Sequence, residues 1–415
     1  MAVKRKDAPV RDLRSALEFL RGMQGQLVET EVEVDPAAEL SGVYRYVGAG
    51  GTVKRPTRTN GPAMLFKNLK GHPGASAAIG VLASRERVAR LLGCAKEDLG
   101  RLLCESVASP IAPVLDESPA PCQEVVHLAS EPDFDLFRLL PAPTNTPVDA
   151  GPYITLGMCY ATHPDTGCSD VTIHRLCIQG RDELSIAGAI RGEPVRLCRC
   201  VSVAERAIAH AEFVIEGEIV PGVRVQEDQH SGTGFAMPEF PGYNGVASSE
   251  CWLLKVKALT HRRAPILQTC IGPSEEHVNM AGIPTEASIL GMLERAMPGR
   301  VKNVCAHRSG GGKYMAILQM CKKAPTDEGR QRQAALLAFS AFPELKHVVL
   351  AVREAPLSAV HLRNMYELAR FGAVVFPPVP AWYAKPQSLE EAERQIAARI
   401  LAQFGVEAPG APCWG

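Results

Sequence analysis

The middle of the chain, from about Leu140 to His307, is a long succession of predicted β-strands. Short runs of β-branched and apolar residues recur there, and turns rich in glycine and proline separate them. The predicted strands are Tyr153–Tyr160, Val171–Ile178, Val195–Val201, Phe213–Val220, Leu253–Leu259, Ile266–Ile271 and Val301–His307. Because strands must pair with one another, we expect an extended sheet or a partial barrel in this part of the chain.

The sequence on either side mixes helices with strands. Asp12 opens an amphipathic helix, Ala63–Phe66 reads as a short buried strand, and Ser84 caps a second helix. Near the C-terminus a strand at Val348–Val352 precedes a helix capped by Ser358. A strand at Ala373–Phe376 and a last helix, opened by a capping box of Ser388 and Glu391, complete a βαβα unit with parallel strands.

These patterns together predict a mixed fold of the α+β or α/β class with three domains. Residues 1–115 form an N-terminal α/β domain, 116–320 a central β-rich domain resembling a split barrel, and 321–415 a C-terminal α/β segment.

Composition narrows the class of protein. The 415 residues carry 45 basic and 45 acidic side chains, so no net field favours nucleic acid or a membrane surface. No apolar run is long enough to span a bilayer, and the N-terminus lacks the apolar core of a secretory signal. Thirteen cysteines without a CxxC pair are typical of reduced thiols, so we expect a cytoplasmic protein.

The predicted strand Val171–Ile178 carries an unusual cation. Its alternation places Arg175 on the same face as Ile173 and Cys177. A guanidinium on an apolar face is costly unless an anion receives it. That anion belongs either to a structural salt bridge or to a bound ligand, and the strand alone does not distinguish the two.

Three polar segments of the middle region are candidates for chemistry. The first runs from Asp170 to Glu183; the second is Pro221–Tyr243, which holds Glu227, Asp228, His230 and Glu239; the third is Gly272–Glu286, which holds Glu275, Glu276 and His277. We interpret them as loops on a β scaffold, where carboxylates and histidines bind metals or move protons, unless they are simply solvated. The glycine-rich run at 309–314 lacks the Ser or Thr of a phosphate-binding loop, but its Lys313 is a candidate to meet an anion.

Several ordered motifs resemble one known family. DVTIHRL, EGEIVPGVRVQEDQ, AMPEFPGY, GPSEEHVNMAGIPTEASI and SGGGKYMAILQM are similar to motifs of the UbiD family of decarboxylases, and most closely to its hydroxybenzoate branch, from about Asp12 to Val349. The resemblance implies prenylated FMN, a divalent metal, usually Mn²⁺, and K⁺ as cofactors. It also implies reversible, non-oxidative decarboxylation of an aromatic or α,β-unsaturated acid.

The resemblance assigns roles to individual residues. Arg175 matches the family's central arginine and Glu227 the first glutamate of its proton network, whereas the second glutamate has no clean match and is either Glu239 or Asp228. The positions that line the flavin are Thr155, Thr172 and Ile173, with Arg175 beside them and Lys313 as a further cofactor-binding candidate. The metal ligands implied are Asp170, in place of the usual asparagine, and Glu183.

Two departures from the family are visible. Arg181–Ile186 resembles two family segments merged into one, so that roughly fifty residues and the metal-binding histidine are missing. We expect this loss to leave apolar surface uncovered and sheet edges unpaired. From about Val348 the chain instead resembles the end of UbiX flavin prenyltransferases, with Arg353, Glu354, Tyr383 and Arg399 at matching positions. The first, flavin-binding part of that family is absent, so the segment is expected to serve as fold, in a natural fusion or a recombined gene.

The function expected is decarboxylation of a hydroxybenzoate-type acid, with a flavin prenyltransferase as cofactor supplier, a homo-oligomeric state, and neither a nucleic-acid partner nor a membrane span. A non-catalytic or assembly remnant with an incomplete site is the main alternative. A metal-dependent hydrolase using Glu183, Glu227 and His277 is a third, less favoured, possibility.

Overall fold

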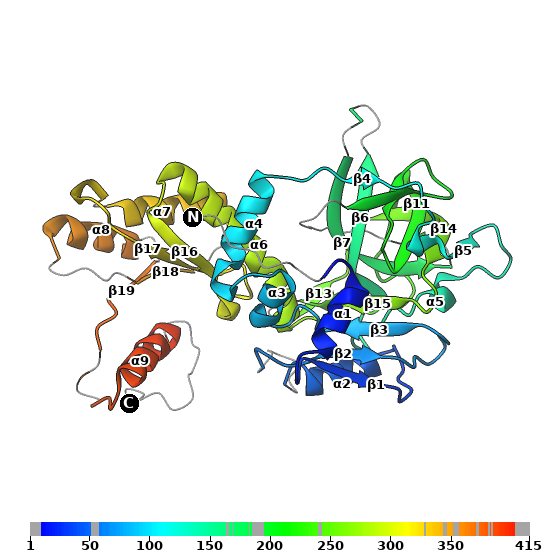
Figure 1. Ribbon diagram of the computed structural model, residues 1–415, viewed down its shortest axis with the longest axis horizontal. Helices are drawn as coiled ribbons and strands as arrows, with labels where there is room; N and C mark the ends of the chain where they lie inside the picture. The colour runs from blue at the N-terminus through cyan, green and yellow to red at the C-terminus, as the bar shows by residue number, and fades with distance from the viewer. Residues whose placement is uncertain are drawn as a thin grey trace. The chain divides into compact units, whose positions relative to one another are not determined.

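We analysed a computed structural model of the chain (Figure 1). It describes residues 10–50, 58–162, 166–167, 169–181, 183–184, 195–239, 243–327, 329–342, 347–351, 357–370, 373–380, 382 and 385–402. The chain forms two compact units. The larger unit comprises Lys4–Lys96 and Ala108–Asn279, and the smaller unit comprises Met1–Val3, Glu97–Val107 and Met280–Gly415.

The N-terminal part of the larger unit is a small α/β layer. Its four-stranded sheet has the order β1-β2-β3-β15, formed by β1 (Leu27–Thr30), β2 (Ala63–Phe66), β3 (Ser76–Ile79) and β15 (Ile266–Thr269). Three helices accompany it, α1 (Leu13–Arg21), α2 (Glu39–Val47) and α3 (Arg85–Leu91). The predicted caps are confirmed: Asp12 accepts a hydrogen bond from the Ser15 amide, and Ser84 accepts one from the Arg87 amide.

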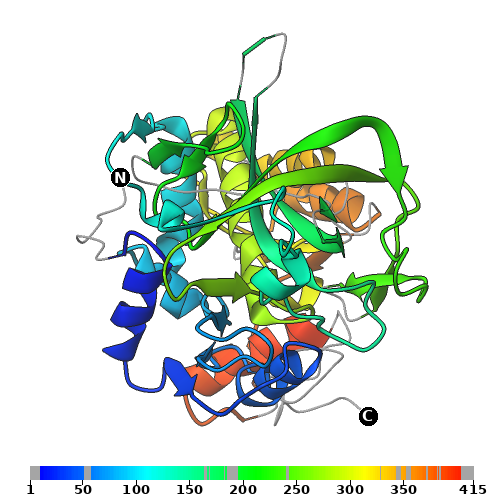
Figure 2. The same cartoon turned by 90° about the vertical axis from the view of Figure 1, so that its right-hand side faces the viewer.

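The central part of the larger unit is an antiparallel sheet with the order β11-β14-β8-β7-β6. Its strands are β6 (Tyr153–Thr162), β7 (Ser169–Gly180), β8 (Glu183–Leu184), β11 (Phe213–Val225) and β14 (Cys251–His261), and β5 (Val125–Leu128) pairs with β14. Figure 2 shows the long green strands of this sheet. Leu176, Ile178 and Leu259 are buried in its apolar core. The mixed α/β class is thus confirmed, and in the described residues the strands form an open sheet rather than a closed barrel.

The two strands on either side of Arg181 pair with each other. Gly180 pairs with Glu183 and Ile178 with Leu184, while Leu184 also pairs with Leu254 of β14. The two-residue strand β8 therefore joins β7 to β14, and the sheet is continuous where we expected an unpaired edge. The Arg181 guanidinium donates to the carbonyl oxygens of Phe134, Glu131 and Pro132, which links the end of β7 to the segment before α5.

Two smaller sheets complete the larger unit. One has the order β10-β9-β4, from β10 (Arg206–Ile208), β9 (Arg196–Arg199) and β4 (Val114–Leu115), and the other pairs β12 (Phe235–Pro238) with β13 (Asn244–Val246). A short helix, α5 (Leu136–Leu139), lies between β5 and β6 in the sequence. The short 3-10 helices of the chain are Lys96–Asp98, Pro121–Gln123, Arg308–Gly310 and Pro325–Asp327.

The smaller unit is built on a second four-stranded sheet. Its order is β16-β17-β18-β19, from β16 (Val301–Ala306), β17 (Met315–Met320), β18 (His347–Ala351) and β19 (Val374–Phe376). Its helices are α4 (Leu99–Ala108), α7 (Arg330–Ala341), α8 (Ala359–Arg370) and α9 (Leu389–Ala402). The predicted strand–helix–strand unit is confirmed, since β18 pairs with β19 in parallel, and Ser388 accepts the predicted capping bond from the Glu391 amide.

One element was not expected. Gly272–Glu286, which we interpreted as a polar loop, instead contains the start of α6 (Glu275–Ala296), a helix that begins in the larger unit and continues into the smaller one. Pro284 lies inside this helix, and Pro and Gly within a helical pattern weaken its sequence signal. Among the described residues, no helix is both long enough and apolar enough to cross a membrane.

Candidate active site

The side chain of Arg175 is the centre of a carboxylate–guanidinium–carboxylate cluster. Its Nε lies 3.1 Å from Glu227 Oε1, and its Nη2 lies 3.3 Å from Glu227 Oε2. Its other terminal nitrogen lies 3.1 Å from Glu239 Oε1. The anion that the sequence required for Arg175 is therefore supplied by two glutamates from the second polar segment.

Three elements bring these residues together. Arg175 lies on β7, Glu227 follows the end of β11, and Glu239 follows β12. Glu227 is also bonded to the loop before β14, because its amide donates to the Ser248 carbonyl at 2.8 Å. The Glu239 amide donates to the Tyr243 carbonyl at 2.8 Å. Backbone hydrogen bonds thus hold the main chain at Glu227 and Glu239 in place, independently of the contacts that their side chains make with Arg175.

Glu227 is 2% exposed, and donors surround its carboxylate. Besides the two bonds from Arg175, the Tyr153 hydroxyl donates to Oε1 at 2.9 Å and the Ser248 amide donates to Oε2 at 3.1 Å. Sequence reasoning missed Tyr153. The available signal was a tyrosine inside a predicted buried strand, because a buried phenol usually finds a hydrogen-bond partner.

The structure separates the two candidates for the second glutamate. Glu239 contacts Arg175 and its side chain is 28% exposed. Asp228 is buried and shapes its own loop instead: it accepts hydrogen bonds from the Gly234 amide at 2.7 Å and from Gln226 Nε2 at 2.6 Å. Glu239 is therefore the better candidate for a network residue.

The electrostatics of the cluster keep Arg175 charged. Burial by itself would lower the pKa of Arg175, but Glu227, Tyr153 and Glu239 together outweigh it and the pKa is raised. His174 is the neighbour on the opposite face of β7, where burial and the charge of Arg175 lower its pKa to about 4. His174 is consequently neutral near pH 7 and adds no second positive charge.

Arg175 retains capacity for a further ligand. A guanidinium has five N–H donors. Three of them are used in the hydrogen bonds to Glu227 and Glu239, so two remain among the described contacts. The side chain is 34% exposed. Two donors of one planar guanidinium, on a partly exposed side chain, match the geometry of a carboxylate.

The predicted flavin-lining residues do not all present the same surface. Ile173 shares the face of Arg175, whereas alternation places Thr172 on the opposite face of β7. The Thr155 hydroxyl is buried and already bonded, 3.0 Å from Thr269 Oγ1 and 2.8 Å from the Cys270 amide. Thr155 thus links β6 to β15, Thr172 is exposed, and Ile173 lies partly buried on the same face of β7 as Arg175.

The predicted metal ligands do not converge. Asp170 lies near the start of β7, while Glu183 pairs with Gly180 at the end of the same strand. Ten residues of strand separate those points by roughly 30 Å, far more than the reach of two carboxylates that share one ion. The described backbone therefore does not fit a metal held jointly by Asp170 and Glu183; their side chains lie outside the described part. No group of three or more His, Cys, Asp or Glu among the described residues forms a metal site.

Other predicted residues belong to other elements of the fold. Lys313 belongs to the smaller unit, in a glycine-rich turn where Gly311 and Gly312 have positive φ angles of 62° and 77°. Glu276 is buried and accepts hydrogen bonds from the Gly80 and Leu82 amides at 2.7 and 2.8 Å, which joins α6 to the segment after β3. Burial raises the pKa of Glu276 to about 7.

The prenyltransferase-like positions are only partly described. Arg353, Glu354 and Tyr383 lie outside the described residues. The guanidinium carbon of Arg399, on α9, lies 5.9 Å from the centre of the Phe376 ring. That contact links the last helix to β19 and is consistent with a role of Arg399 in the fold.

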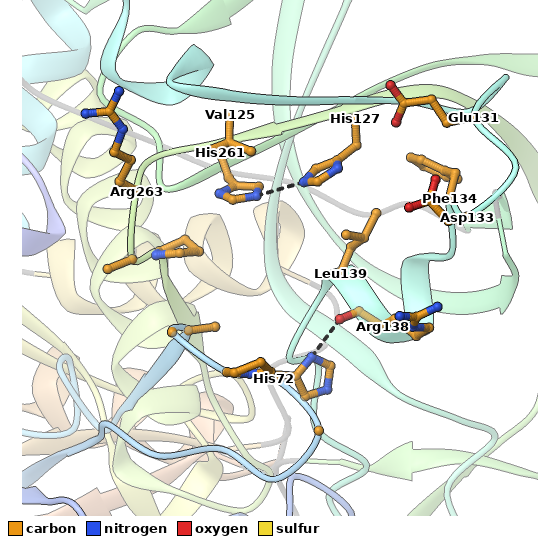
Figure 3. A pocket seen from close by; sticks show the side chains of 16 residues that line it. His72, Val125, His127, Glu131, Asp133, Phe134, Arg138, Leu139, His261 and Arg263 are labelled. Carbon is orange, nitrogen blue, oxygen red and sulfur yellow. Dashed lines mark hydrogen bonds between the residues drawn. The ribbon is translucent and has the colours of Figure 1, made fainter.

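A separate cavity of about 480 Å³ in the larger unit contains none of the predicted site residues (Figure 3). His127 Nε2 lies 3.2 Å from His261 Nε2 there, and His72 Nδ1 lies 3.0 Å from the Arg138 carbonyl. His261 Nδ1 lies 2.8 Å from the Arg262 carbonyl, so that nitrogen carries a proton and His127 is the donor within the pair.

Comparison with known proteins gives matches over most of the chain. Three family models match: the 3-octaprenyl-4-hydroxybenzoate carboxy-lyase N-terminal domain over 20–107, the Rift-related domain over 114–185 and 179–275, and the C-terminal domain over 278–370. The Rift-related domain matches in two pieces that both use residues 179–185, as expected for two family segments merged into one.

Individual relatives also match most of the chain. Gallate decarboxylase of Lactiplantibacillus plantarum is 46% identical over 395 residues, covering 82% of this chain and 80% of the relative. The apo 3,4-dihydroxybenzoic acid decarboxylase of Enterobacter cloacae superposes with a TM-score of 0.78 at 46% identity, covering 87% of this chain and 85% of that one. HmfF of Pelotomaculum thermopropionicum, solved with prFMN, gives 0.71 at 28% identity, with coverage of 87% and 90%.

A short part of the chain is similar to a different group of proteins. The flavin prenyltransferase UbiX of Chlamydia trachomatis is 45% identical over 78 residues, which are 19% of this chain and 41% of the relative. Most of that relative therefore has no counterpart here.

Proposed function

Since this chain belongs to the UbiD family of carboxy-lyases, we propose that it decarboxylates a hydroxybenzoate-type aromatic acid at Arg175, Glu227 and Glu239. The observation that carries the proposal is the Arg175 guanidinium, which binds two carboxylates and still has two donors on an exposed side. Relatives named for gallate and 3,4-dihydroxybenzoate support an aromatic acid with ring hydroxyls as the substrate.

The substrate carboxylate binds to the two remaining N–H donors of Arg175. It then lies beside two glutamates that share a single cation. Three carboxylates around one guanidinium repel one another, so uptake of one proton by the network relieves the excess negative charge. Substrate binding and proton loading are therefore coupled at this site.

Glu227 is the proton donor in the proposed reaction. The bond between the ring carbon and the carboxylate breaks, carbon dioxide leaves, and the electron pair is finally taken by a proton from Glu227 that forms the new C–H bond. The Glu227 carboxylate recovers a proton from water on the side where Arg175 and Glu239 are exposed. One proton is consumed in each turnover, as the overall reaction requires.

The cofactor we propose is prenylated FMN, supported by the relative solved with prFMN and by Ile173, an apolar residue on the same face of β7 as Arg175. Prenylated FMN, when bound, supplies an electron-accepting ring system that makes carbon dioxide a feasible leaving group. A flavin prenyltransferase would supply it. Mn²⁺ and K⁺ remain predictions of the family resemblance, and no step is assigned to them because Asp170 and Glu183 do not meet.

The test is a reconstitution. The protein is produced together with an active flavin prenyltransferase, its absorbance is recorded, and release of carbon dioxide is measured for gallate, 3,4-dihydroxybenzoate and 4-hydroxybenzoate. We expect flavin absorbance and turnover of at least one acid. Glu227→Gln should keep the flavin spectrum and lose turnover. A flavin-loaded wild type that releases carbon dioxide from none of these acids would overturn the proposal.

One observation favours a second candidate, a non-catalytic or assembly subunit. The double use of residues 179–185 by the Rift-related model indicates that part of this domain is missing. A protein that stays colourless when produced with the prenyltransferase supports that candidate. For the enzyme, we further propose a cytoplasmic homo-oligomer, in keeping with the free thiols of the described cysteines.

A further inference from the structure

The Glu227 carboxylate has no vacant acceptor position in the described structure. A carboxylate offers about four lone-pair positions. Tyr153 and Arg175 Nε occupy Oε1, and a terminal nitrogen of Arg175 and the Ser248 amide occupy Oε2. This arrangement suits an ionised group well. A proton donor must also exist in the protonated form, and then one oxygen needs an acceptor instead of a donor.

Only one of the four partners can make that change. Guanidinium and backbone N–H groups donate and cannot accept hydrogen bonds, whereas a hydroxyl does both. The Tyr153 hydroxyl is therefore the only one of these partners that can accept a hydrogen bond from protonated Glu227. Burial, together with Cys177 and Glu227, raises the pKa of Tyr153, so the phenol remains neutral and keeps its hydrogen.

The hydrogen of Tyr153 needs another acceptor when Glu227 is protonated. Cys177 is the direct cross-strand partner of Tyr153, and its sulfur is within hydrogen-bonding reach of the hydroxyl. Burial raises the pKa of Cys177 to about 12, so the group is a neutral thiol with a weak acceptor sulfur. Tyr153 and Cys177 are both fully buried, which keeps bulk water from replacing either one.

We infer that Tyr153 is a positioning residue whose hydroxyl rotates between Glu227 and Cys177, and so allows Glu227 to hold the proton used in the reaction. In the ionised state the hydroxyl donates to Glu227 Oε1. In the protonated state Glu227 donates to the Tyr153 oxygen and the phenol hydrogen turns to the Cys177 sulfur. No covalent bond of Tyr153 breaks, because the proton delivered to substrate comes from Glu227 and is replaced from water. This inference rests on the proposed function of Glu227.

The first experiment uses turnover. In flavin-loaded Tyr153→Phe we expect kcat to fall between tenfold and a hundredfold with KM changed less than threefold, since Arg175 still binds the substrate. Tyr160→Phe is the matched control, because Tyr160 lies on the same strand and makes no side-chain hydrogen bond among the described residues. An unchanged kcat in Tyr153→Phe overturns the inference, and so does an equal loss in Tyr160→Phe.

A second pair of variants tests the alternative acceptor and remains available if Tyr153→Phe fails to fold. Cys177→Ala removes the acceptor and should lower kcat severalfold. Cys177→Ser retains one and should restore most of it. Equal activity of the two variants contradicts the rotation, whereas a loss in both kcat and KM indicates a packing role only.

A third measurement does not depend on activity. Infrared difference spectra between wild type and Glu227→Gln, taken on flavin-free protein at low pH, isolate the carbonyl band of protonated Glu227. In a Tyr153→Phe background this band should move to higher frequency, because the carboxyl has lost its acceptor. A band that does not move overturns the inference even if the enzyme is active. If the band shifts but the wild-type protein shows no turnover, the hydrogen bond between Glu227 and Tyr153 is supported and the proposed decarboxylase function is rejected.

Discussion

Two groups of residues predicted around β7 are placed very differently by the fold. Arg175 and Glu239 are 64 positions apart in the sequence, yet their side chains meet, and Glu227 joins them. Asp170 and Glu183 are close in the sequence, yet Asp170 lies near the start of β7 and Glu183, on β8, pairs with Gly180 at its far end. Along a strand, residues move apart by about 3.3 Å per position, whereas lateral pairing within the sheet β11-β14-β8-β7-β6 brings segments that are distant in the sequence together. Closeness in sequence is therefore a poor guide to a shared ligand when a strand intervenes.

The largest effect on stability and turnover is expected from removing the cation of the group formed by Arg175, Glu227 and Glu239, which we call the convergent group. Arg175→Met leaves Glu227 buried without its counter-charge, so the free energy of unfolding should fall by about 3 kcal/mol or more. Turnover should fall about a thousandfold, because the same group binds substrate. Denaturant titration and carbon dioxide release measure the two effects. Arg138→Met, at an exposed arginine on α5, is the control and should change neither; a stable and active Arg175→Met would break the comparison.

Glu276, a buried glutamate that accepts hydrogen bonds from backbone amides, provides a contrast with Glu227, which is paired with Arg175. Burial raises the folded-state pKa of Glu276 to about 7 from its ordinary value of 4.5. Between those values the folded state holds more protons than the unfolded state, so stability falls as pH rises. Relative to Glu276→Gln, wild type should lose about 3 kcal/mol of unfolding free energy from pH 4.5 to 7. Denaturant midpoints across this range test it, and a flat difference would show that the carboxyl does not titrate there.

A smaller effect is expected at the exposed end of the convergent group. Glu239→Gln removes one charge from a carboxylate that is 28% exposed, so stability should change by less than about 1 kcal/mol. Turnover should fall about tenfold, because proton recovery slows while Glu227 still delivers its proton. Steady-state kinetics beside Glu227→Gln give the comparison. A loss as complete as that of Glu227→Gln would make Glu239 an equal partner.

The smallest effect concerns the separated pair. Sites far apart act independently, so Asp170→Ala and Glu183→Ala should be additive within about 0.5 kcal/mol in stability. Manganese affinity, measured by titration, should likewise show no coupling between them. A strong coupling in either quantity would show that the two carboxylates share an ion after all, and would remove the contrast between the two groups.

Much of the fold could be predicted from local signals. The Asp12, Ser84 and Ser388 caps and the strand–helix–strand order near the C-terminus followed from patterns that depend on a few adjacent residues. Helix α6 could not be found in this way, because Pro284 and the glycines around it weaken the helical pattern.

The site was only partly predictable. Arg175 was recognisable from its face on a strand, and Glu239 required the resemblance to a family. Tyr153 and the Ser248 amide approach Glu227 only after β6 and the segment before β14 take their places, and no local pattern encodes that contact. The separation of Asp170 from Glu183 likewise depends on β7 being continuous to Gly180.

The parallel pairing of β17 with β18 has a practical consequence for anyone who shortens this protein. Met315, Ala316 and Ile317 pair with His347, Val348 and Val349, so the prenyltransferase-like segment supplies a strand that β17 needs. Truncation before His347 would expose the hydrogen-bonding edge of a strand whose Met315 and Ala316 are buried, and exposed edges of this kind recruit other chains. A shortened version is thus expected to aggregate. The prenyltransferase-like segment prevents this self-association by covering the edge of β17.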